Sequence, residues 1–154
     1  MIAAAIVACH PAAKPTVAQL PSDAQLHDGS AAFAPAERYR GHPVVLDFWA
    51  GWCEECRAMV PQLTRLTEAF EKDGLVVVGV DAGESPDEAA RYAKALGITY
   101  PIAYDPDLVY SDRVGAGELP ALLVIDRTGA IVHRSRRLDE DTLGAIRRVL
   151  HRDP

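Results

Sequence analysis

The sequence predicts an α/β sandwich built on a mixed β-sheet, and three features of its pattern lead to this class. An apolar run at 44–50, typical of a buried strand, passes directly into a helical pattern that begins at residue 54. A second strand and a helical insert follow them. The chain then ends in a hairpin and an amphipathic helix. Parallel strands joined by a helix and antiparallel strands joined by a turn would share one sheet.

The first half of this unit has clear end signals. The helix at 54–72 follows the first strand, and near-continuous β-branched residues at 75–81 predict the second. The next helix begins at Ser85, because serine can cap, Pro86 suits the first helical position, and Glu88 completes a capping box. Gly97 ends this helix after Leu96.

The second half is predicted from shorter patterns. The turn at 126–129 joins two strands into a hairpin, and Asp139 caps the last helix. Upstream of the first strand the pattern is weak, with a short helical turn at 31–39. The other predicted elements are a strand at 98–104, a short helix at 106–113, hairpin strands at 121–125 and 130–136, and a helix from 139 to about 151.

Length and composition indicate one folded domain. The 154 residues are 49% apolar and 25% charged, as in globular proteins, and suffice for a single core. The net charge of −6 and the lack of a long basic run argue against a nucleic-acid partner. We place the domain at 26–154. Residues 1–25 are predicted to be a truncated signal or lipobox-like segment followed by a proline-rich, flexible linker.

The first residues carry an export signal that ends at Cys9. The apolar run from Ile2 to Ala8 is too short to span a bilayer. Ile6-Val7-Ala8-Cys9 resembles a bacterial lipobox, in which signal cleavage leaves a lipidated cysteine. A signal peptide normally has a basic residue before its apolar run, but none precedes this one. The alternative is an alanine-rich terminus with an incidental cysteine. We expect an extracytoplasmic or periplasmic protein, tethered to the membrane through Cys9.

The chemistry is indicated by Trp52-Cys53-Glu54-Glu55-Cys56, at the junction of the first strand and its helix. The first sulfur would lie at the helix N-terminus, where unpaired N–H groups and the helix dipole favour a thiolate. The second would lie one turn further, within reach of a mixed disulfide on the first. Half of a zinc site is the alternative, but no other ligands occur at paired spacing, so no metal is expected.

Asp47 interrupts an otherwise apolar strand. Period-2 alternation places it on the same face as Val45 and Trp49, so burial should raise its pKa. A buried carboxyl close to the second sulfur could accept the proton that Cys56 must lose before it attacks. The alternative is an aspartate that faces solvent.

Three motifs together resemble the TlpA/ResA/DsbE-like group of thioredoxin-fold proteins, which are extracytoplasmic thiol–disulfide oxidoreductases. They are the runs Val45–Cys56 with Pro61, Val78–Ser85 and Gly117–Asp126. The resemblance covers roughly 41–150, and the helical segment 86–97 corresponds to the insertion typical of this group. Glu55 replaces the usual proline before the second cysteine, and Ala121 the usual threonine after the later proline.

The resemblance assigns further roles. Cys53 would be the nucleophile and Cys56 the resolving thiol, while Glu84 would lie beside the pair and tune its acidity. Pro120 would be the cis-proline of the fold. The backbone of Leu119 would pair with an extended substrate, with Trp52 contributing to the same binding surface.

We therefore expect a thiol–disulfide oxidoreductase, leaning towards reduction, whose only redox group is the Cys53–Cys56 pair. The resemblance suggests an apocytochrome c or its chaperone as the protein disulfide substrate, and a membrane thiol protein as electron donor. A copper-delivery or other metal-binding module on the same fold is the alternative, although such relatives use wider cysteine spacing. A third reading is a peroxidase of the peroxiredoxin type. It would need a proline and a threonine before the reactive cysteine, and the strand that leads to Cys53 lacks them.

Overall fold

A computed structural model describes residues 18–151 of the chain. Its seven-stranded sheet has the order β2-β1-β5-β4-β3-β6-β7. The strands are β1 Leu26–His27, β2 Ala32–Phe33, β3 Val44–Trp49, β4 Val76–Ala82, β5 Ile102–Asp105, β6 Ala121–Ile125 and β7 Ile131–Ser135. The helices are α1 Pro35–Arg38, α2 Glu54–Phe70, α3 Pro86–Leu96, α4 Val109–Arg113 and α5 Glu140–His151, with a 3-10 turn, η1 Glu71–Asp73, after α2.

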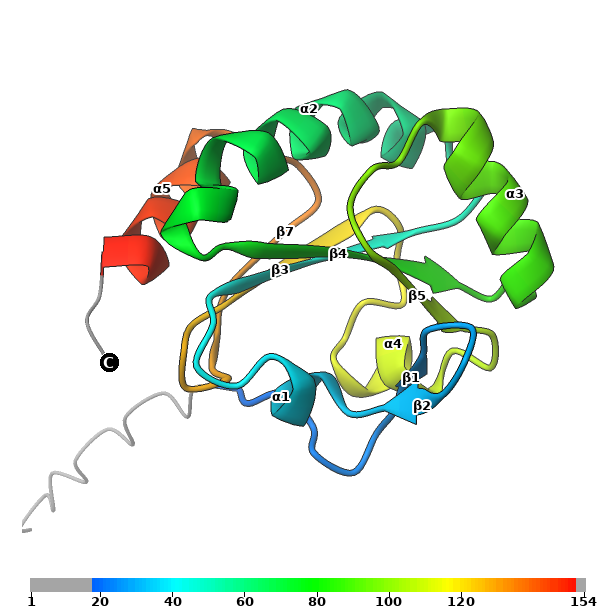
Figure 1. Cartoon of the computed structure of the whole chain (residues 1–154), viewed down its shortest axis with the longest axis horizontal. Helices are drawn as coiled ribbons and strands as arrows, with labels where there is room; N and C mark the ends of the chain where they lie inside the picture. Colours follow the sequence, from blue (N-terminus) through cyan, green and yellow to red (C-terminus); the bar gives the residue numbers. More distant parts are fainter. Residues whose placement is uncertain (1–17, 152–154) are drawn as a thin grey trace, which may run out of the picture.

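The sheet is mixed, as the sequence predicts. Strand β3 pairs in parallel with β4 and antiparallel with β6, and β4 pairs in parallel with β5. Helices α2, α3 and α5 cover one face of the sheet, whereas α1 and α4 lie on the other (Figure 1). All six residues of β3 are buried because the strand is central and covered on both faces.

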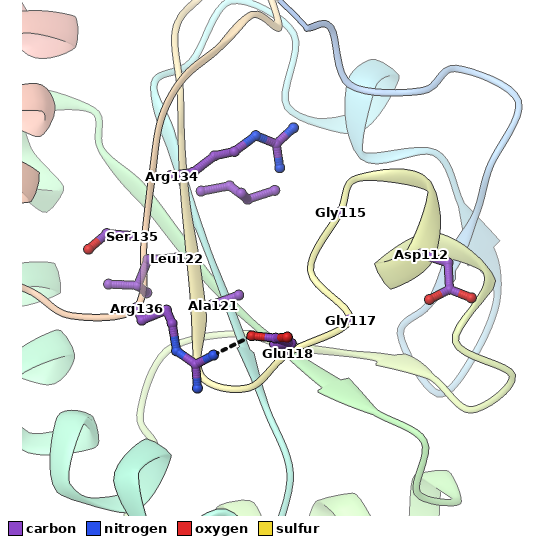
Figure 2. A pocket seen from close by; sticks show the side chains of 10 residues that line it. Asp112, Gly115, Gly117, Glu118, Ala121, Leu122, Arg134, Ser135 and Arg136 are labelled. Carbon is purple, nitrogen blue, oxygen red and sulfur yellow. Dashed lines mark hydrogen bonds and ion pairs between the residues drawn. The ribbon is translucent and has the colours of Figure 1, made fainter.

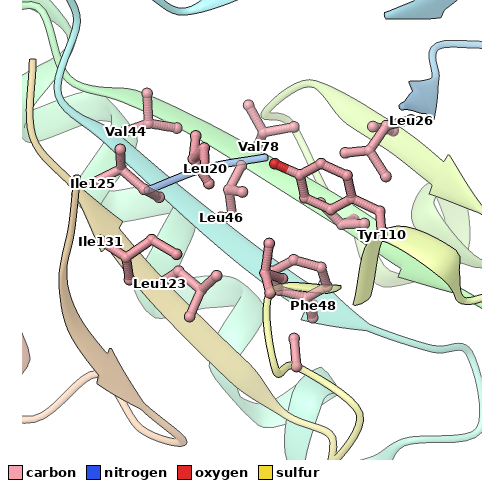
Figure 3. Close-up of a cluster of buried hydrophobic side chains, with 14 of the residues drawn as sticks. Leu20, Leu26, Val44, Leu46, Phe48, Val78, Tyr110, Leu123, Ile125 and Ile131 are labelled. Carbon is pink, nitrogen blue, oxygen red and sulfur yellow. The ribbon is translucent and has the colours of Figure 1, made fainter. Parts of the chain in front are cut away.

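The two faces of β3 contribute to separate clusters. Leu46 and Phe48 pack with Tyr110 of α4 in the cluster of Figure 3. Val45 packs instead against α2 and α5, through Leu63 and Ile146 among others. Asp47 and Trp49 alternate with Leu46 and Phe48, so they share the α2 face with Val45, as predicted.

The helix ends follow the predicted signals. Ser85 and Glu88 form a capping box at the start of α3, and Gly97 closes its end in the left-handed region. The backbone N–H of Thr142 donates to the Asp139 carboxylate, which caps α5. No helix within the described part combines the length and apolar character that crossing a membrane needs.

Three local predictions differ from the structure. The segment 31–39 forms β2 and the single turn α1, because Phe33 packs into the core as part of a small antiparallel pair. The strand expected at 98–104 is extended only at its end, in β5. The helix expected from 106 begins at Val109, after Leu108 adopts a left-handed conformation.

The start of the packed chain also differs from the expected boundary at residue 25. Leu20 and Ala24 are buried in the core, and the N–H of Leu20 donates to the carbonyl of Gly129. Gln19 forms an isolated bridge with Ala130. Residues just before 25 are therefore packed beside the hairpin rather than free as linker. The lipobox-like segment with Cys9 lies outside the described residues.

Candidate active site

Cys53 and Cys56 form a disulfide at the N-terminus of α2. Cys53 is the N-cap residue, and its sulfur accepts a hydrogen bond from the backbone N–H of Cys56 at 3.2 Å. In the reduced protein, this N–H and the positive end of the helix dipole would stabilise a thiolate on Cys53. The predicted pairing of the two sulfurs is therefore present, and the first has the more favourable position for a thiolate.

Burial does not separate the two cysteines in the disulfide form. Cys53 is 5% exposed and Cys56 3% exposed, so neither residue is clearly more accessible in this state. Both belong to an apolar cluster with Trp49 of β3 and Ala93 of α3. The prediction that Cys53 is the nucleophile depends on its N-cap position rather than on greater exposure.

Asp47 is buried on the α2 face of β3. Its Oδ2 accepts a hydrogen bond from the hydroxyl of Tyr100 at 3.1 Å, whereas its Oδ1 has no partner among the described residues. Burial raises the pKa of Asp47 to about 7, although the Tyr100 hydrogen bond lowers it. The burial and the raised pKa agree with the prediction. A role in accepting the Cys56 proton stays a prediction.

Glu84 lies just after β4 and reaches the turn that precedes the cysteines. Its Oε2 accepts a hydrogen bond from the backbone N–H of Gly51 at 2.9 Å. Gly51 leads directly into Trp52 and Cys53. The structure therefore places Glu84 at the active-site turn through a backbone contact.

Asp81, the penultimate residue of β4, is not among the site residues that the sequence predicts. Asp81 is fully buried, and it stands opposite Trp49 in the parallel pairing with β3. Burial, together with the neighbouring Glu84 carboxylate, raises the pKa of Asp81 to about 8. The same signal that singles out Asp47, an acid within an apolar strand, could have found it.

A small cavity of about 130 Å³ lies beside Trp52 and Leu119. Trp52 is 72% exposed, and Leu119 packs against the cysteine cluster. The Leu119–Pro120 peptide bond is cis, as the resemblance implies. Leu108, Ala82 and Ala116 give the cavity a largely apolar lining. Trp52 and Leu108 are the exposed apolar members of this lining, and Leu119 connects it to the cysteine cluster.

A larger cavity of about 510 Å³ lies between the hairpin and the loop that follows α4 (Figure 2). Neither cysteine lines it. Arg136 pairs with Glu118 at 2.7 Å and also donates to the carbonyl of Leu119 at 2.7 Å. This arginine therefore already binds the backbone that is expected to pair with a substrate.

Within 18–151 no three histidine, cysteine or acidic side chains come close enough together to form a metal site.

A disulfide at a helix N-terminus, beneath a cis-proline loop and on a mixed sheet, defines a thioredoxin-like protein with a redox-active cysteine pair. The chain belongs to the AhpC/TSA family, whose model matches residues 18–134. Its similarities to ResA proteins and to a DsbE structure confirm the TlpA/ResA/DsbE-like group that the sequence motifs indicate.

Two relatives are thiol-disulfide oxidoreductases named ResA. The protein of Geobacillus thermodenitrificans is 32% identical over 93 residues, which cover 60% of this chain and 53% of the relative. The Bacillus subtilis protein is 30% identical over 93 residues, covering 60% of this chain and 52% of the relative. The match thus spans about half the length of these relatives.

A solved structure supports the fold. The Chlorobium tepidum protein assigned as a thiol:disulfide interchange protein DsbE superimposes with a TM-score of 0.77 at 23% identity. The superposition covers 87% of this chain and 96% of that structure. The predicted thioredoxin-like fold is therefore confirmed.

Proposed function

We propose that this protein is a thiol–disulfide oxidoreductase that reduces protein disulfides outside the cytoplasm. The observation that carries the proposal is the Cys53–Cys56 disulfide at the start of α2, with the Cys56 N–H directed at the Cys53 sulfur. The names of the ResA relatives support the activity. The short spacing of the two sulfurs suits exchange within one helical turn.

The reaction proceeds by two thiol–disulfide exchanges. The Cys53 thiolate attacks one sulfur of the substrate disulfide, forming a mixed disulfide and releasing the other substrate sulfur as a thiolate, which takes a proton from solvent. Cys56 then loses its proton and attacks the Cys53 sulfur. This step releases the second substrate thiolate and leaves the Cys53–Cys56 disulfide, so two electrons have moved to the substrate. An external thiol protein must return the pair to its reduced form.

Asp47 is the residue we assign to the proton of Cys56. Its raised pKa of about 7 lets the carboxylate form accept a proton near neutral pH. It lies on the face of β3 that α2 covers, as does the cysteine cluster. Glu84 acts instead on the first step, because its carboxylate is bound to the turn before Cys53.

Substrate docking involves Trp52, Leu119 and Pro120. The exposed Trp52 ring and the small cavity beside it offer apolar surface to residues that flank a substrate cysteine. An extended substrate that pairs with Leu119 would compete with Arg136 for its carbonyl oxygen. Docking would therefore release Arg136 from Leu119 while Glu118 retains it.

The substrate, location and electron donor follow from the same resemblance. We propose an apocytochrome c or its chaperone as substrate, a membrane thiol protein as donor, and a lipidated Cys9 as the tether. Mass spectrometry of protein from the native host tests the tether: an acylated N-terminal Cys9 supports it, and an intact, unmodified Met1 refutes it.

The function itself is tested by trapping. Cys56→Ser should retain the first attack and stall as a mixed disulfide through Cys53, whereas Cys53→Ser should neither reduce disulfides nor trap a substrate. Cys9→Ser in a soluble form serves as the matched control and should reduce disulfides normally. Full activity of the Cys53 variant would refute the proposal, and the protein trapped on Cys53 would identify the substrate.

A further inference from the structure

Asp81 is linked to the active-site turn through two hydrogen bonds in series. Its Oδ1 accepts the backbone N–H of Glu84 at 3.2 Å, and the Glu84 carboxylate accepts the N–H of Gly51 at 2.9 Å. Gly83 makes this connection possible, since its φ of +96° turns the chain back after β4. A strand residue is therefore connected to the turn that carries Cys53.

The second oxygen of Asp81 needs an explanation. Asp81 is fully buried, yet its Oδ2 has no hydrogen-bond donor within residues 18–151. A buried carboxylate oxygen without a donor is unfavourable, whereas a protonated carboxyl can itself donate. After burial, the Glu84 carboxylate is the largest cause of the raised pKa of Asp81, and the backbone N–H of Glu84 binds Asp81 Oδ1. Two charged carboxylates so close together would repel each other, so one shared proton stabilises the pair.

We propose that Asp81 is a positioning residue of the redox site: as a neutral acid it holds the Glu84 carboxylate on the Gly51 N–H and thereby fixes the turn that carries Cys53. The proposal depends on the proposed function for its importance in the reaction, but the arrangement itself can be tested without turnover. When the proton leaves to solvent, repulsion between the two carboxylates weakens the bond from Glu84 to Gly51.

The charged and titratable groups around Asp81 and Glu84 are consistent with a protonated Asp81. Glu88, in the first turn of α3, adds negative charge and raises the pKa of Asp81 further. Tyr104, opposite Asp81 in β5, stays neutral because burial raises its own pKa above the ordinary value for tyrosine. Trp49, opposite in β3, carries no charge. The pKa of Asp81, raised to about 8, places the release of its proton just above neutral pH.

The amide of Gly51 reports on this network. We would measure its ¹H and ¹⁵N chemical shifts from mildly acidic to alkaline pH in the oxidised protein. Over the same range we would measure the rate at which dithiothreitol reduces the disulfide, divided by the thiolate fraction of dithiothreitol at each pH. The wild type should show a step in both near pH 8. Asp81→Asn should lose both steps and keep the low-pH shift throughout, because a neutral amide can still donate to Glu84. Glu88→Gln, whose side-chain oxygen can still cap Ser85, should retain both steps at a slightly lower pH, because the Glu88 charge contributes to the raised pKa of Asp81.

Two results would overturn the proposal. One is an unchanged Gly51 titration in Asp81→Asn. The other is a ¹³C carboxyl shift showing that Asp81 is already ionised in mildly acidic solution. This second result is measured on the wild-type protein, so it does not depend on the folding of the variant. A Gly51 step with the expected loss in Asp81→Asn, in a protein that reduces no disulfide, would support the network and refute the proposed function instead.

Discussion

The hydroxyl of Tyr100 donates a hydrogen bond to Asp47 Oδ2 at 3.1 Å in the buried layer between β3 and α2. Gly79 lets the two residues meet, since a Cβ atom there would lie 3.1 Å from the Tyr100 ring and 2.9 Å from Trp49 Nε1. One hydrogen bond compensates little of the cost of burying a charge. Asp47 therefore remains largely protonated until the pH approaches neutrality.

Replacing Asp47 with asparagine should stabilise the protein in a pH-dependent way. Asparagine is nearly isosteric and can accept the Tyr100 hydrogen bond, but it never ionises. The folded pKa of Asp47 is raised to about 7, so the unfolded chain releases the proton first as the pH rises. Wild-type stability thus falls between about pH 4 and pH 7 relative to Asp47→Asn, by on the order of 4 kcal/mol.

Urea unfolding of both proteins at acidic and mildly alkaline pH measures this difference. The advantage of the variant should be absent in acid, where both folded and unfolded Asp47 are protonated, and complete above neutrality. An advantage of equal size at every pH would mean that Asp47 does not titrate in the folded protein with a raised pKa.

The same substitution should slow the second step of the reaction. Cys56 must become a thiolate to resolve the mixed disulfide, and asparagine cannot take its proton. In Asp47→Asn the mixed disulfide with a model substrate should persist longer at neutral pH, as followed by rapid acid quenching and mass spectrometry. The rate of Cys53 alkylation in the reduced protein serves as the control and should change little. Equal lifetimes would remove Asp47 from the proton transfer.

Glu84→Gln should make Cys53 more acidic. The glutamine oxygen can still accept the Gly51 N–H, so the change removes a negative charge while the contact remains. Less repulsion of the thiolate should move the midpoint of iodoacetamide alkylation to lower pH, by on the order of half a unit because solvent screens a half-buried group. Glu88→Gln is the matched control and should shift the midpoint less. An unchanged midpoint in Glu84→Gln would show that its charge does not act on Cys53.

Local signals predicted most of the fold and the cysteine site correctly. The capping box of α3, the buried run of β3 and the Cys-x-x-Cys spacing are each contained in a few consecutive residues. The packing of Leu20 beside the hairpin was missed because it joins segments more than a hundred residues apart. Asp81 could have been noticed as an acid within an apolar strand, but its link to Gly51 through Glu84 exists only in the folded chain.

The contact between Gly51 and Tyr92 is a tertiary feature of the same kind. A Cβ atom at residue 51 would lie 2.2 Å from the Tyr92 ring, which comes from α3. The φ of Gly51 is not in the left-handed region, so the backbone itself would accept alanine. The need for glycine at this position therefore comes from the tyrosine that packs over the turn.

Gly51→Ala should destabilise the protein by about 1–3 kcal/mol, since the Tyr92 ring or the turn must move to accommodate the methyl group. The cost should largely disappear in a Tyr92→Ala background, which a double-mutant cycle of urea unfolding measures. Gly117→Ala is the control, because its Cβ would meet only an ordinary contact, 3.5 Å from Asp112. The half-exposed Tyr92 ring can also turn towards solvent, so a cost near the lower limit is expected. If Gly51→Ala costs as much without the Tyr92 ring as with it, the tyrosine does not set the requirement for glycine.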